Sequence, residues 1–180
     1  MENSLSDLDH LKKTYTAARN KYRPDHINVL FIAEAPPCAL DRFFYFEDVK
    51  KQDSLFLEIM GILYPEAKQR YLNSGRDIEL KEELLENFKL DGYWLMDLSE
   101  IPTSLTDASL DSYVPSLLSR LEKLIDKNTP LILIKSDVFD ACYTPLKEQG
   151  YKVINERMPF PGSGQQKVFR EKFKRALELV

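Results

Sequence analysis

The run Ile-Asn-Val-Leu-Phe-Ile-Ala at residues 27–33 is the strongest indication of the fold class in this sequence. It is apolar almost throughout, which is typical of a strand buried on both faces, as central strands of parallel sheets are. Similar runs occur at residues 93–98, 131–134 and 151–154. We therefore expect a four-stranded parallel sheet.

Segments with helical spacing of apolar residues separate and flank these strands. They lie at residues 5–18, 55–63, 84–88, 117–125, 139–146 and 169–180. Strands that alternate with helices favour right-handed crossovers, with helices on both faces of the sheet. Since 180 residues suit one core, we predict a single α/β domain over residues 1–180.

Composition narrows the range of functions. No apolar run of about 18 residues is present and the first residues do not resemble a secretory signal, so we expect a cytoplasmic protein without membrane contact, monomeric by default. Cys38 and Cys142 match no metal-binding spacing, so we expect reduced thiols, no metal and no cofactor.

The charge of the chain bears on whether it binds nucleic acid. The net charge of -4 argues against strong non-specific binding to nucleic acid. Basic residues nevertheless crowd residues 12–23 and 167–175. They form either solvated helix faces or a basic side where the two termini meet.

Ligands of parallel α/β sheets bind beyond the carboxyl ends of the strands, which directs attention to the loops that begin at Glu34, Ser99, Lys135 and Glu156. The first loop starts with Ala-Glu-Ala-Pro-Pro at residues 33–37, whose prolines stiffen the turn that carries Glu34. Such a carboxylate can orient water or stabilise positive charge.

Four consecutive aromatic residues follow at positions 43–46, and at least one should face the site or the solvent. An aromatic plane beside a carboxylate suits a flat ligand such as a nucleobase. The alternative is that Glu34 caps a neighbouring loop and the aromatic residues fill a small satellite core.

The loop at residues 158–166, Met-Pro-Phe-Pro-Gly-Ser-Gly-Gln-Gln, leads into the last predicted helix. Exposed N–H groups at a helix start attract anions. Ser163 would donate to a phosphate or cap the helix, and Lys167 and Arg170 would reinforce phosphate binding. The alternative is an ordinary loop without a ligand, because the segment lacks the P-loop spacing.

Together these features resemble the uracil-DNA glycosylase superfamily: a buried strand ending in Glu-Ala-Pro, an aromatic loop, and a proline-rich loop before the last helix. Several branches of that family have Gly-Glu-Ala-Pro-Gly where this chain has residues 33–37. The second family motif, often His-Pro-Ser, falls at residues 160–163 or 158–161. The resemblance covers most of the chain in element order.

The resemblance implies a three-layer α/β/α sandwich, DNA or a nucleobase or nucleoside as partner, and a role in DNA repair. The chemistry would be hydrolysis of the N-glycosidic bond of a flipped-out base, in which Glu34 would be the catalytic carboxylate. The implied base-binding residues are Ala35, Pro36, Phe44, Phe46 and Asp97. The implied phosphate-binding residues are Gly162, Ser163, Gly164, Gln165 and Lys167.

The chain departs from the family at several points. Neither His10 nor His26 falls in the second motif, and the four cysteines of the iron–sulfur branches are missing. Asp97 lies where the family often has an amide. Its carboxylate would prefer an edge of the base that carries hydrogen-bond donors. The alternative is that it bonds backbone N–H groups at the entry to a loop. Lys135 either offsets the negative charge locally or faces solvent.

Two other functions stay open. One is a nucleic-acid or nucleotide binding module that keeps the fold without catalysis, favoured by the missing histidine and the negative charge. The other is a metal-assisted hydrolase on a flavodoxin-like sheet, with Glu34 and Asp97 as its metal-binding or acid/base carboxylates.

Overall fold

The computed structural model describes residues 2–51, 53–162 and 164–180, with only the backbone described at residues 2–6 and 40. Its sheet consists of β1 (Val29–Ala33), β2 (Tyr93–Asp97) and β3 (Leu131–Leu133). The strands are parallel and follow the order β2-β1-β3. β1 is central and buried along its whole length, which confirms the α/β class and the parallel sheet.

The expectation of four strands is wrong. At residues 151–154 only Val153 forms a parallel bridge, with Leu131. The Val153 N–H donates to the Tyr151 carbonyl and the Glu156 N–H to the Ile154 carbonyl, so the backbone bonds to itself on both sides of the bridge. A ladder cannot continue through such turns, although the segment is as apolar as a strand.

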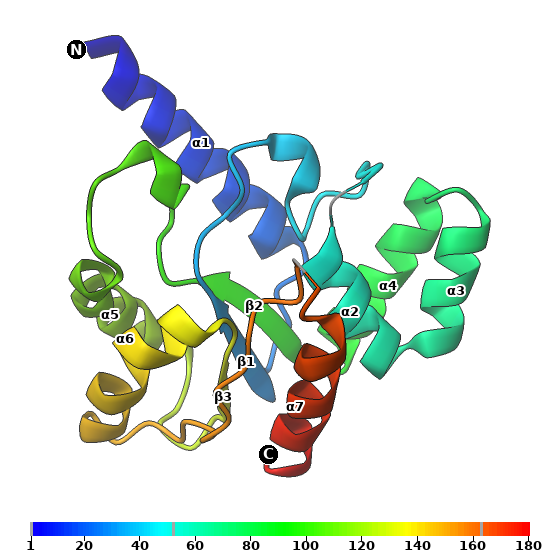
Figure 1. Ribbon diagram of the computed structural model, residues 1–180. Helices are drawn as coiled ribbons and strands as arrows, with labels where there is room; N and C mark the ends of the chain where they lie inside the picture. Colours follow the sequence, from blue (N-terminus) through cyan, green and yellow to red (C-terminus); the bar gives the residue numbers. More distant parts are fainter. Residues whose placement is uncertain (1, 52, 163) are drawn as a thin grey trace.

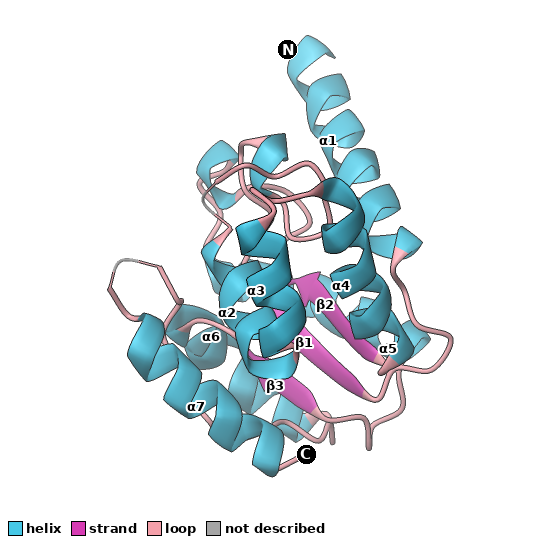
Figure 2. Cartoon of the chain, turned by 90° about the vertical axis from the view of Figure 1, so that its right-hand side faces the viewer, coloured by secondary structure: helices cyan, strands magenta, loops and turns pink. Residues whose placement is uncertain are grey.

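Seven α-helices surround the sheet in the described part of the chain. They are α1 (Glu2–Lys21), α2 (Ser54–Leu63), α3 (Pro65–Asn73), α4 (Ile78–Leu90), α5 (Val114–Leu124), α6 (Ser136–Glu148) and α7 (Gln166–Glu178). α5 and α6 cover one face of the sheet, and α2, α4 and α7 cover the other (Figures 1 and 2). The N-terminal part of α1 extends away from the rest of the chain in both views.

The core is centred on β1. Phe31 packs against Phe88 of α4, Tyr93 of β2 and Phe173 of α7, with ring centroids 5.8, 5.7 and 5.3 Å away. On the opposite face, α5 and α6 contribute buried aliphatic side chains and the thiol of Cys142. Cys38 is exposed, and both cysteines are free thiols.

α3 was not expected from the sequence, because its nine residues are mostly polar and only Tyr71 is buried. Pro65 at its start supplies a backbone angle that already suits a helix. α6 forms despite Pro145, which lies in its last turn, where the lost hydrogen bond disturbs little of the helix.

The two basic segments do not meet. α1 and α7 lie at different ends of the molecule (Figures 1 and 2), so the basic side considered from the sequence does not form. Several of these residues instead pair with carboxylates: Lys12 with Glu100 at 2.9 Å, and Arg170 with Glu58 at 2.8 Å. Within the described residues, no helix combines the length and the apolar character needed to cross a bilayer.

The register of the sheet brings the candidate residues together at the carboxyl ends of the strands. Ala33 is paired with Asp97, and the Ser99 N–H donates to the Glu34 carbonyl at 2.9 Å. On the other side of β1, the Ile134 N–H donates to the Ile32 carbonyl at 2.8 Å. Glu34, Asp97 and Lys135 therefore lie where three adjacent strands end.

Candidate functional site

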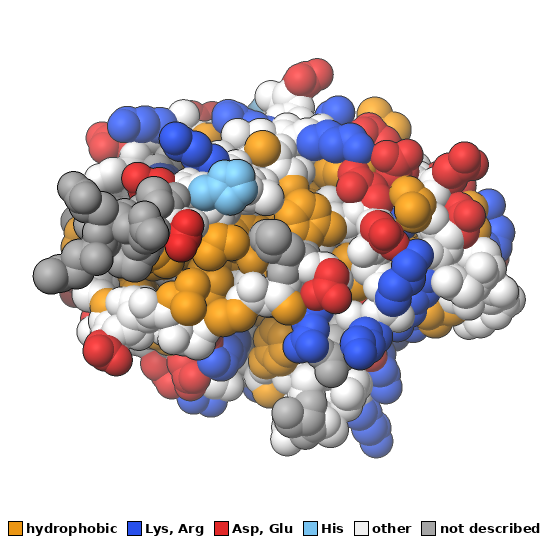
Figure 3. All heavy atoms as spheres, turned by 90° about the horizontal axis from the view of Figure 1, so that it is seen from above, with side chains coloured by type: hydrophobic (Ala, Val, Ile, Leu, Met, Phe, Trp, Pro, Cys, Tyr) orange, Lys and Arg blue, Asp and Glu red, His pale blue; other side chains and the backbone are white. Residues whose placement is uncertain are grey.

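A cleft of about 730 Å³ opens at the carboxyl ends of the strands. Its walls come from residues 33–38, the aromatic segment (residues 43–46), the start of α2, the loop after β2, the start of α6 and the loop before α7. Seen from above, hydrophobic side chains gather in the middle of this face, with acidic and basic side chains intermixed around them (Figure 3). The volume lies in the range of sites for small organic ligands.

Glu34 is engaged on both carboxylate oxygens. Its Oε1 accepts a hydrogen bond from the Thr103 hydroxyl at 3.2 Å, and its Oε2 accepts one from the Lys135 ammonium. The Lys135 ammonium also lies 3.3 Å from Asp137 Oδ2. The side chains of Glu34 and Lys135 remain 22% and 33% exposed, so solvent and ligands can reach this ion pair from the cleft.

Asp97 also lines the cleft, but its carboxylate is buried. Burial raises the pKa of Asp97 to about 6, and the positive charges of Arg19 and Arg120 only partly offset that rise. Within the described part of the chain, the carboxylate accepts no backbone N–H bond, so it does not cap the loop. A buried carboxyl that titrates close to neutral pH suits proton transfer or ligand recognition.

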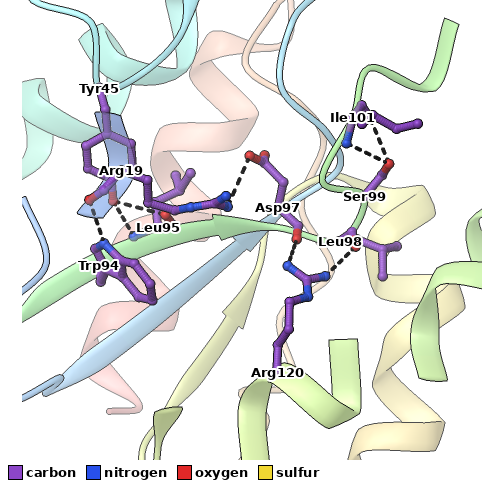
Figure 4. Close-up of polar contacts among 9 residues, drawn as sticks. All are labelled: Arg19, Tyr45, Trp94, Leu95, Asp97, Leu98, Ser99, Ile101 and Arg120. Carbon is purple, nitrogen blue, oxygen red and sulfur yellow. Dashed lines mark hydrogen bonds and ion pairs between the residues drawn. The ribbon is translucent and has the colours of Figure 1, made fainter. Parts of the chain in front are cut away.

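Two arginines hold the end of β2 from opposite sides (Figure 4). Arg19 of α1 reaches toward Asp97, with its Nη1 3.8 Å from Oδ2 and no hydrogen-bond partner among the described residues. Arg120 of α5 donates to the backbone carbonyls of Asp97 and Leu98, at 2.9 and 2.6 Å. The Arg19 charge therefore faces the Asp97 carboxylate at a distance too long for a hydrogen bond.

The aromatic segment is mostly packed inward. Phe44 contributes to the cleft wall, but its ring is buried edge-on against Tyr45 and Phe56. The ring of Phe46 packs on Tyr15 and Phe43 and does not line the cleft. The Tyr45 hydroxyl bonds to the backbone N–H and carbonyl of Leu95, at 2.7 and 3.0 Å, which fastens the segment to β2.

Phe160 is an aromatic residue of the cleft that the sequence reasoning did not single out. It lines the cleft with 43% of its surface exposed, whereas Phe44 is buried. Its position between Pro159 and Pro161 was the available signal, because two prolines hold a side chain on a stiff loop. Phe160 therefore offers the more accessible surface for stacking on a flat ligand.

The predicted phosphate-binding residues separate into two groups. Gly162 and Gln165 line the cleft, as do Ala35 and Pro36 of the first loop. Gly164 and Lys167 are exposed and lie outside the cleft wall. Ser163 lies outside the described residues. Arg170, named with them, is paired with Glu58.

Other residues of the cleft came from the strand-end loops without a motif to mark them. Thr103 lies in the loop after β2, and Lys135 lies two residues after the end of β3. Arg42 lies between the first loop and the aromatic segment, and Asp53 precedes α2, where it pairs with Arg76 at 2.5 Å. The rule that ligands bind at strand ends points to Lys135 and Thr103, but it does not predict their contacts with Glu34.

No group of three or more His, Cys, Asp or Glu side chains that could hold a metal ion occurs within residues 2–51, 53–162 and 164–180. Comparison with known proteins gave no match: no protein-family model, no curated protein and no solved structure is similar to this chain.

Proposed function

We propose that the protein binds a nucleobase of DNA or of a nucleoside in this cleft and hydrolyses its N-glycosidic bond. The fold would be a three-layer α/β/α sandwich of the uracil-DNA glycosylase type. The observation that carries the proposal is the position of Glu34. This partly exposed carboxylate follows the central strand of the sheet and faces a largely apolar cleft. Phe160, on the loop before α7, and Asp97, at the end of β2, also line the cleft and add a stacking surface and a polar group for the base.

The chemistry follows from charge. As the bond between sugar C1′ and the base nitrogen breaks, its electron pair leaves with the base and positive charge develops on the sugar. A carboxylate beside C1′ stabilises that charge. A water molecule then forms the new C1′–O bond and gives up a proton, which Glu34 can accept before it passes to the base.

A binding protein without turnover is the second candidate. The observation that favours it is that both oxygens of Glu34 already have partners, Thr103 and Lys135. A substrate must displace or share these contacts before the carboxylate can act.

The test is release of bases by the purified protein. Single- and double-stranded oligonucleotides carrying uracil, hypoxanthine, xanthine or a mismatch, together with uridine, inosine and xanthosine, are incubated at neutral pH. Strand cleavage by alkali reports abasic sites, and chromatography reports free bases. The proposal expects base release from at least one substrate.

Glu34→Gln is the decisive variant, with Glu79→Gln of the exposed surface of α4 as its matched control. We expect Glu34→Gln to lower the rate by roughly 10²-fold or more, since removing one group that stabilises transition-state charge has an effect of that size. Glu79→Gln should retain the full rate. Equal rates for Glu34→Gln and the wild type would contradict the role of Glu34, and binding without base release would favour the second candidate.

A further inference from the structure

Lys135 has an unusual backbone. It joins β3 to α6 with a φ of 85° and a ψ of 136°, a conformation that residues with side chains rarely adopt. Arg76 is the other residue with positive φ among the described non-glycine residues. Strained residues of this kind cluster at functional sites, where the surrounding structure holds them in place.

The strained turn presents the Lys135 ammonium to the cleft. An ammonium has three N–H donors, and Glu34 and Asp137 are its carboxylate partners in the described part of the chain. A third donor is thus available to a ligand. Burial lowers the pKa of Lys135, but the hydrogen bonds and charges of Glu34 and Asp137 outweigh this effect and raise it, so the group is a cation at neutral pH.

We propose that Lys135 is a second catalytic residue, whose ammonium stabilises the leaving base and gives it a proton. This role rests on the proposed function. Glycosidic cleavage separates charge, with the sugar becoming positive and the base negative. Glu34 and Lys135 present a negative and a positive group side by side at the cleft, which complements that separation.

The proton balance closes within the pair. The C1′–N electron pair goes to the base, which takes a proton from Lys135. Water adds to C1′ and its proton passes to Glu34. Because Glu34 and Lys135 are hydrogen-bonded to each other, that proton returns to Lys135, and the net reaction is the addition of water across the glycosidic bond.

The surroundings reinforce the positive potential at this point. Lys135 precedes the first turn of α6, a helix of 13 residues whose N-terminal end carries partial positive charge. The backbone N–H groups of that turn and the ammonium are thus at the same end of the cleft. A base that leaves with negative charge is favoured there.

Lys135→Met tests the role because it keeps the length of the side chain and removes the charge. Substrates are compared in pairs that differ in leaving ability: uracil with 5-fluorouracil, and hypoxanthine with xanthine, the second of each pair forming the more stable anion. We expect Lys135→Met to slow release of uracil or hypoxanthine by about 10²-fold or more, and release of the better leaving base by about tenfold or less. Lys135→Arg, which keeps the charge, should recover part of the rate.

The controls separate the possible failures. Lys147→Met, on the exposed surface of α6, should match the wild type. Glu34→Gln should slow both members of a pair equally, since Glu34 acts on the sugar. Equal losses on both members for Lys135→Met, or no loss, would overturn the role of Lys135 alone. A wild type that releases no base would overturn the proposed function and this role together.

Discussion

At the scale of single residues, the site depends on a conformation that its sequence disfavours. The backbone of Lys135 has a φ of 85°, for which glycine would be the natural residue. Holding a side chain there costs on the order of 1–3 kcal/mol. This strain occurs at the position after β3 where the Lys135 ammonium pairs with the Glu34 carboxylate. A functional constraint on Lys135 would explain why the strained conformation persists.

Lys135→Gly should therefore make the protein more stable. Relief of the backbone strain stabilises the folded state. Two effects offset part of this gain: loss of the partly exposed ion pair, at about 0–1 kcal/mol, and the greater freedom of glycine in the unfolded chain, at about 0.5–1 kcal/mol. The expected net gain in the free energy of unfolding is about 1 kcal/mol, measured by urea unfolding. Lys135→Ala keeps the strain and loses the ion pair, so a Gly variant no more stable than the Ala variant would refute this account.

At the scale of elements, α4 packs a lysine against α2 beneath the cleft. Lys81 is fully buried, its ammonium lies 4.4 Å from the centre of the Phe56 ring, and it has no hydrogen-bond partner among the described residues. Burial lowers the pKa of Lys81 to about 8, with the charge of Asp53 partly opposing the change. The folded state thus carries a cation that it solvates poorly.

Lys81→Met should stabilise the protein at pH 7, because it fills the same space without the charge. A pKa depressed from 10.5 to about 8 means that the folded state binds the proton more weakly than the unfolded state. The wild type therefore gains stability as the pH rises from 8 toward 10.5, by about 3 kcal/mol at most. The advantage of Lys81→Met should shrink by pH 10, and Lys174→Met on the surface should show no such trend.

The elements themselves were largely predictable from the sequence. Burial drives apolar periodicity, so the three strands and six of the seven helices follow from it. α3 does not, because it buries only Tyr71 and is held by its neighbours. The fourth strand fails for the opposite reason: residues 151–154 are apolar enough, but local hydrogen bonds decide their backbone.

The site was predictable in part. Glu34 follows from the rule that ligands bind at strand ends, because that rule needs only the order of the elements. Asp97 was singled out through the family resemblance, and it too lines the cleft. The pairing of Glu34 with Lys135 depends on the register of three strands and on a strained turn, and neither is visible in a pattern of residue types. Phe160, rather than Phe46, lines the cleft because the aromatic segment turns inward to pack against α1 and β2.

At the scale of the whole molecule, charge sets how nucleic acid can bind. The net charge is -4, and acidic and basic side chains are intermixed around the cleft (Figure 3). Cations near the cleft are largely occupied: Lys135 by Glu34, and Arg76 by Asp53. Arg42 lines the cleft and is exposed, with no ion pair among the described residues.

A face of this kind predicts a shallow dependence of DNA affinity on salt. Each neutralised phosphate contributes about -0.9 to the slope of log K against log salt concentration, so one or two contacts give a slope of about -1 to -2. Fluorescence anisotropy with a labelled double-stranded oligonucleotide between about 50 and 200 mM KCl measures this slope. Over that range of salt, about 6–10 phosphate contacts would change the affinity by roughly 10³–10⁵. Arg42→Gln should reduce the slope by about one, whereas Lys174→Gln on α7 should leave it unchanged. A slope steeper than about -4 would require a continuous track of phosphate contacts, which intermixed charges cannot provide. That result would contradict this account and would favour long DNA as the substrate over a nucleoside or a short flipped segment.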